Sequence, residues 1–155
     1  NTATDLPASI GEPPPIAITA FRRDENTVCG SIKNVRFRNI TCLGENGVLI
    51  HGTENNPIKD ISFENLQVTL SKTSKWNCGI YDLRPAIDVG ITESRNSCFF
   101  IKNAENVTIE KTSAKFGNVC ESYAHGLYAE NVKNLELIRF NAESASEDYD
   151  NIKII

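Results

Sequence analysis

The sequence predicts an all-β protein, a parallel β-helix of stacked coils with its loops on one side, and three observations support this fold class. A strand-like segment recurs along the chain, and each copy begins with Asn or Asp and continues with apolar residues at every second position. The intervals between copies are in the twenties, or about twice that, except for a shorter last interval before the half-copy at the end. No segment carries the apolar spacing of an amphipathic helix over three turns.

The repeated segment is clearest at 31–41 (SIKNVRFRNIT), and it returns at 57–70, 103–116 and 131–142, with a half-copy at 151–155. Asn and Asp suit the corners of a coil, because both tolerate left-handed backbone and bond their own main chain. The turn residues of the successive copies are Asn34, Asp60, Asn106, Asn134 and Asn151. The aliphatic residues that follow them are expected to face the interior.

A second strand precedes the repeat at 47–52, 98–103 and 126–131. One coil is therefore a strand, a corner, a second strand and a variable loop, and equivalent strands of neighbouring coils pair in parallel. Residues 16–155 are predicted to form a single β-helix domain of about six coils, part of a longer helix. The Pro-rich residues 1–15 have no period and are expected to form an extended lead-in.

The alternative is an antiparallel sandwich of short strands. Sandwiches need tight hairpin turns, and the dipeptide Asn-Gly, which favours such turns, occurs only once, at Asn46-Gly47. The parallel arrangement is therefore preferred.

Composition restricts the partners. The chain has 155 residues, of which 40% are hydrophobic and 23% charged, and its formal net charge is −4. An acidic chain is a poor partner for nucleic acids and anionic membranes, which attract basic surfaces. No apolar run approaches the roughly 20 residues that span a bilayer.

Cysteines and glycosylation sequons point to a secreted, extracellular protein. Asn39 and Asn106 each begin an Asn-X-Thr sequon. The cysteines show no CxxC motif and no zinc-like spacing, so they either form one or two disulfides or remain thiols buried in the core. They are Cys29, Cys42, Cys78, Cys98 and Cys120.

The long irregular stretch 71–96 contains the strongest candidate binding site, at 76–84. Trp76 and Tyr81 offer flat faces for a sugar ring, and Asp82 and Arg84 offer hydrogen bonds to hydroxyls, or to a uronate carboxylate for Arg84. In the alternative interpretation, the two aromatic residues pack this loop against the coils while Asp82 and Arg84 pair with each other.

Catalytic groups are less evident. Hydrolysis of a glycosidic bond needs two carboxyl groups, and Asp82, Asp88 and Glu93 are close in sequence without forming a recognisable pair. His51 and His125 are either catalytic or packed at corners and in the wall. No metal site and no cofactor site is predicted.

The segments 31–66 and 75–85 (KWNCGIYDLRP), with the later repeats, resemble the C-terminal half of glycoside hydrolase family 28. This family comprises polygalacturonases and rhamnogalacturonan hydrolases, and the resemblance covers most of residues 16–155. It implies a right-handed parallel β-helix, a location outside the cell, and inverting hydrolysis of pectic polysaccharides.

The family's catalytic motifs, Asn-Thr-Asp, Asp-Asp, Gly-His-Gly and Arg-Ile-Lys, are absent from this sequence. No catalytic residue can therefore be assigned, and enzymatic activity is left undecided. Two hypotheses follow: the C-terminal part of a pectinase-like hydrolase, or a non-catalytic structural or carbohydrate-binding β-helix that self-associates through its coil ends. The expected partners are a pectic polysaccharide and other copies of the chain.

Overall fold

A computed structural model of the chain describes residues 12–155. Most of the predicted lead-in at 1–15 lies outside these residues. The described part contains strands and loops and no helix, so it has no helix long and apolar enough to cross a membrane. Its strands are β1 (Ile16–Thr19), β2 (Lys33–Gly44), β3 (Val48–His51), β4 (Ile58–Leu70), β5 (Ile80–Asp82), β6 (Ile91–Glu93), β7 (Phe99–Phe116), β8 (Leu127–Ala142) and β9 (Ile152–Ile154).

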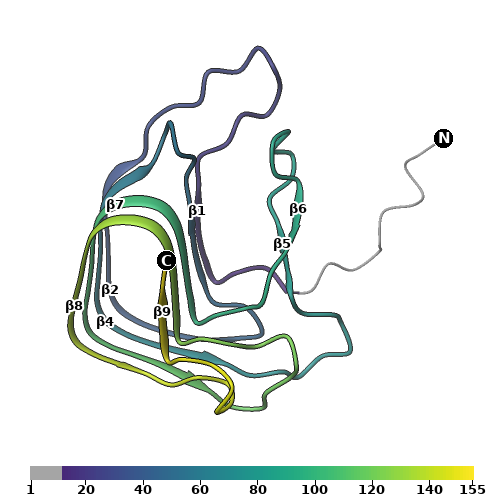
Figure 1. Cartoon of the computed structure of the whole chain (residues 1–155), viewed down its shortest axis with the longest axis vertical. Coiled ribbons are helices and arrows are strands. Elements are labelled where there is room, and N and C mark those ends of the chain that lie inside the picture. Colours follow the sequence, from purple (N-terminus) through teal and green to yellow (C-terminus); the bar gives the residue numbers. More distant parts are fainter. Residues whose placement is uncertain (1–11) are drawn as a thin grey trace.

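Seven of these strands form one sheet in which every neighbouring pair is parallel. The order is β1-β3-β7-β4-β2, and β8 pairs with both β7 and β9. Figure 1 shows the long strands as nested, bent ribbons around a common interior. The predicted all-β, parallel architecture is confirmed, and the antiparallel sandwich is excluded.

The bends of the long strands are made by Asn and Asp residues in left-handed backbone. Asn34, Asp60, Asn106 and Asn134, four of the predicted turn residues, have φ values between 55° and 60°. Their side chains stack from strand to strand, since Asn106 Nδ2 donates to Asp60 Oδ1 at 2.9 Å and Asn134 Nδ2 donates to Asn106 Oδ1 at 2.9 Å. Each corner thus satisfies the polar groups of the next one.

The interior is filled by columns of apolar side chains in register. Phe37 on β2 pairs with Phe63 on β4, which pairs with Ile109 on β7. The rings of Phe37 and Phe63 stack with centroids 5.3 Å apart. Phe63 and Ile109 are fully buried. The period-two pattern of the sequence therefore fixes both the register and the core.

A second, smaller apolar cluster lies outside the bent sheet. The strands β5 and β6 form an antiparallel hairpin within the stretch predicted to be irregular. Figure 1 shows this hairpin standing beside β1, apart from the nested strands. The hairpin packs on the outer residues of the sheet, and the buried members of this cluster are Leu49, Tyr81, Leu83, Ala86 and Phe100.

Candidate functional site: a polar cleft

Three loop segments meet at one end of the hairpin and enclose a cleft of about 600 Å³, here called the polar cleft. The first segment leads from β4 into β5, the second follows β6, and the third joins β7 to β8. Six of the nine lining residues have polar or charged side chains. The lining residues are Asn77, Cys78, Gly79, Ile80, Glu93, Ser94, Arg95, Glu121 and Ser122.

Asn96, which directly follows the lining residue Arg95, connects the walls of the polar cleft. Its side chain is 1% exposed, and its Oδ1 accepts a hydrogen bond from the Gly79 N–H at 2.6 Å. Its backbone N–H donates to the Ser122 carbonyl at 2.9 Å. Through its side chain and its backbone, this one buried residue therefore links all three segments, as a preformed binding site requires.

The first wall also rests on the buried carboxylate of Glu45, which is 2% exposed. Its Oε1 accepts from the Thr73 N–H at 2.7 Å, and its Oε2 accepts from Lys72 Nζ at 3.0 Å and Ser74 Oγ at 2.9 Å. Burial alone would raise the pKa of Glu45, but these bonds and one from the Ser74 N–H lower it to about 2. The carboxylate is thus charged and structural.

Arg95 is the only cationic residue that lines the polar cleft. Its Nη1 donates to the Glu121 carbonyl, and its guanidinium lies 5.2 Å from the centroid of the Tyr149 ring. Within the described part of the chain it forms no ion pair. Its remaining donors can therefore bind an acceptor group in the cleft, such as a carboxylate.

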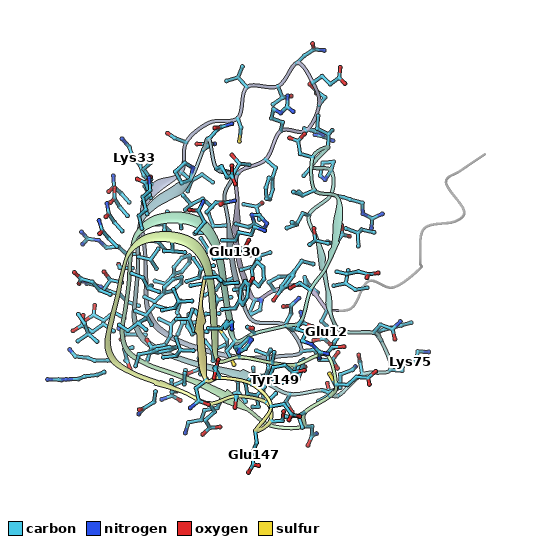
Figure 2. All side chains as sticks on the ribbon, viewed as in Figure 1. Glu12, Lys33, Lys75, Glu130, Glu147 and Tyr149 are labelled. Atoms are coloured by element: carbon cyan, nitrogen blue, oxygen red, sulfur yellow. The ribbon has the colours of Figure 1, made fainter. Side chains whose placement is uncertain are left out.

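Trp76, the first of the predicted binding residues, directly precedes Asn77, a lining residue of the polar cleft, and does not itself line it. Its side chain is 41% exposed, and Lys75 Nζ lies 4.8 Å from the centroid of its ring. Figure 2 shows Lys75 at the outer edge of the loops, away from the nested strands. The ring is therefore accessible to a ligand.

The other three predicted binding residues are engaged within the protein. Tyr81 is 2% exposed and packs on Phe100 with ring centroids 4.7 Å apart. Because the ring is buried, it offers no open face to a sugar. Asp82 and Arg84 form a two-point pair, Nε to Oδ1 and Nη2 to Oδ2, both at 2.8 Å. The hydrogen bonds from Arg84 hold the pKa of Asp82 below its usual range.

The three carboxylates that are close in sequence, those of Asp82, Asp88 and Glu93, have different partners in the structure. Asp82 pairs with Arg84, and Asp88 pairs with Arg22 at 3.0 Å. Glu93 lines the polar cleft, where the other carboxylate is Glu121 from the loop between β7 and β8.

Both histidines pack against aromatic rings. His51 is 6% exposed, lies 4.8 Å from the Phe21 ring, and its Nδ1 is 2.7 Å from the Gly52 carbonyl. Burial is the main reason why its pKa is lowered. His125 Nδ1 lies 2.7 Å from the Asp150 carbonyl, and its ring is 5.5 Å from that of Tyr149. Neither histidine lines the polar cleft.

All five cysteines are free thiols in this structure. Cys42 and Cys98 are buried in the main core, and burial is the main cause that raises the pKa of Cys98 to about 12. Cys29, Cys78 and Cys120 are half-buried. Cys78 also lines the polar cleft.

Both sequon asparagines are exposed at corners of the long strands. Asn39 Oδ1 accepts a hydrogen bond from Asn65 Nδ2 at 2.8 Å. Asn106 uses its Nδ2, the atom that would carry a glycan, to bond Asp60. Asn39 is therefore the more open of the two positions.

Sequence analysis did not identify Glu45, Asn96, Arg95 or Glu121 as parts of one site. The stretch 71–96, which the sequence singled out, contains the first and second walls, but the third wall comes from the loop between β7 and β8, which no sequence pattern places beside them. Among residues 12–155 there is no group of three or more His, Cys, Asp and Glu residues arranged to hold a metal ion. Comparisons with protein-family models, with curated proteins and with solved structures found no match.

Proposed function

We propose that this chain is the C-terminal β-helix portion of a pectinase-like protein outside the cell, and that it binds pectic polysaccharide without hydrolysing it. The nested parallel strands and the stacked Asn corners support a parallel β-helix. Its right-handed twist and its length of about six coils are part of the proposal, and they rest on the sequence repeat and the family resemblance. The resemblance of 31–66 and 75–85 to family 28 supports the choice of polysaccharide.

The observation that carries the proposal is the polar cleft beside the exposed Trp76. Sugar-binding sites combine an aromatic face with side chains that bond hydroxyl groups. Asn77, Glu93 and Glu121 supply such groups, and Arg95 supplies a donor pair for one uronate carboxylate. The carboxylates of Glu93 and Glu121 repel uronate groups, and only the guanidinium of Arg95 attracts them. This balance favours a polymer in which uronate alternates with neutral sugar over one that is fully charged.

Absence of hydrolysis follows from the missing family motifs. Inverting hydrolysis needs one carboxylic acid at the leaving oxygen and one carboxylate that activates water. The family supplies these groups from Asn-Thr-Asp and Asp-Asp motifs, and neither motif occurs in this sequence. The proposal therefore assigns the polar cleft to binding.

Calorimetric titration tests this proposal with oligosaccharides of rhamnogalacturonan, of polygalacturonan and of neutral galactan. We expect binding that is strongest for the rhamnogalacturonan oligomer. Trp76→Ala and Arg95→Ala should each weaken it about tenfold or more, which corresponds to about 1.4 kcal/mol. Arg36→Ala, on the exposed face of β2, is the matched control and should leave affinity unchanged. No binding to any of the three, or binding indifferent to Trp76 and Arg95, would refute the proposal.

A second candidate, a self-associating structural β-helix, rests on two edges of the sheet. The strands β1, β2 and β9 each pair on one side only, and the last two carry exposed apolar side chains. Leu43 on β2 is 74% exposed and Ile154 on β9 is 58% exposed. Open, apolar strand edges favour pairing with another chain. Light scattering across a concentration series separates the two candidates, because a structural filament grows with concentration and a binding module does not.

A further inference from the structure

We propose that Cys78 and Cys120 are a disulfide-forming pair that cross-links two walls of the polar cleft. Cys78 lies in the segment between β4 and β5, and Cys120 lies in the loop between β7 and β8. These loops supply the first and third walls. The inference concerns the chemistry of the walls, so it stands independently of what the cleft binds.

The two loops contact each other at two places. At their beginnings, Lys72 N–H donates to the Asn118 carbonyl at 2.8 Å and Asn118 N–H donates to Ser71 Oγ at 3.0 Å. At their ends, a Cβ added to Gly79 would lie 3.1 Å from Ser122 Oγ. The two cysteines occupy the stretch between these contacts.

The same carboxylate residue anchors both loops near the thiols. The Cys78 Sγ is 4.0 Å from Glu45 Oε2. Tyr123, whose OH donates to the Glu45 carbonyl at 2.9 Å, also donates its N–H to the Cys120 carbonyl at 3.1 Å. Both cysteines are half-buried and pack against the main core at this point.

The titration of Cys78 agrees with this placement. Its pKa is raised to about 11, first by burial and next by the nearby Cys120 thiol, while the Lys72 ammonium opposes the rise. Two thiols influence each other in this way only when they are neighbours. The other three cysteines do not contribute to the shift.

The reaction is thiol–disulfide exchange with a small disulfide such as oxidised glutathione. One cysteine thiolate attacks a sulfur of the oxidant, which forms a mixed disulfide and releases one glutathione thiolate. The second cysteine thiolate attacks the protein sulfur of the mixed disulfide and releases the second glutathione. The two protons lost by the cysteines end on the two glutathione thiols. Because the raised pKa of Cys78 leaves little of this cysteine as thiolate at neutral pH, we expect slow thiol–disulfide exchange.

Peptide mapping of the folded full chain tests the pairing. The chain is incubated with a large excess of oxidised glutathione, alkylated, and digested with trypsin without reduction. We expect segment 76–95 to be joined to segment 116–133, with the loss of two hydrogens, and dithiothreitol to separate them. Cys78→Ser and Cys120→Ser should each abolish the joined peptide. Cys29→Ser, in the loop between β1 and β2, is the control and should retain it.

Hydrogen exchange gives a second, independent measurement. Oxidation should slow exchange in 71–79 and 117–126, since the bond ties both loops, and the other loops should be unchanged. Joining of either cysteine to a different partner, or both remaining alkylatable after oxidation, would overturn the pairing. Failure of oligosaccharide binding would leave the cross-link unaffected, so the two proposals fail separately.

Discussion

At the scale of single residues, Glu45 is the group on which the polar cleft most depends. Its carboxylate is buried, and three successive residues, Lys72, Thr73 and Ser74, bond to it. A buried charge is tolerated only when such bonds replace its lost hydration. The first wall of the cleft therefore starts from an electrostatic anchor.

The pKa of Glu45 makes this anchor testable by pH. Its pKa is about 2 when folded, against a reference value of 4.5. The stabilisation is complete above pH 4.5, decreases as the pH falls, and is lost once the pH passes the folded pKa. We expect Glu45→Gln to lower the free energy of unfolding by about 3 kcal/mol at pH 7, with the two proteins converging towards pH 2.

Urea unfolding at a series of pH values provides the measurement. Glu136→Gln, at an exposed position of β8, is the control and should differ little from the unsubstituted chain at any pH. A difference between Glu45→Gln and the parent that does not change with pH would contradict the assignment of a charged carboxylate at Glu45.

At the scale of elements, the β5–β6 hairpin carries the second wall of the cleft and is attached mainly by apolar contacts. Leu83 is 7% exposed and packs in the cluster with Leu49 and Phe100. Leu83→Ala should lower the free energy of unfolding by about 2 to 4 kcal/mol, because the hairpin unfolds together with the rest of the protein. Faster hydrogen exchange in 80–93 should accompany the loss.

Ile87 is a matched control, because it lies in the same hairpin and is 45% exposed. Ile87→Ala should change the unfolding free energy by less than about 0.5 kcal/mol. Equal effects of the two substitutions would show that the hairpin is not held by its buried face.

The hairpin also shows where prediction from sequence ended. The long strands were predictable because Asn34, Asp60, Asn106 and Asn134 punctuate them and a period of two runs between. The hairpin strands are three residues each, too short to show a period, and Pro85 and Gly90 between them indicate only a loop. The sequence left open whether Tyr81 faces a ligand or packs its loop, and the choice depends on Phe100 of β7, a distant residue on which the Tyr81 ring packs.

At the scale of the whole molecule, the curled parallel sheet acts as a frame and the loops beside it form the polar cleft. Asn96 bonds Gly79 through its side chain and Ser122 through its backbone N–H, so two segments of the stretch 71–96 meet the loop between β7 and β8 at this residue. Such a meeting cannot be read from spacing, because it depends on how far each loop leaves its coil. Trp76 was identified because its residue type alone suggested binding.

We propose that a pectic oligosaccharide binds in the polar cleft and is released without cleavage. The most direct measurement is a two-dimensional ¹H–¹⁵N NMR titration of the chain with a rhamnogalacturonan oligomer, combined with an assay for new reducing ends. We expect chemical-shift changes confined to residues around 76–80, 93–96 and 121–122, and no new reducing ends. Shifts elsewhere, no shifts at saturating sugar, or cleavage of the oligomer would contradict it.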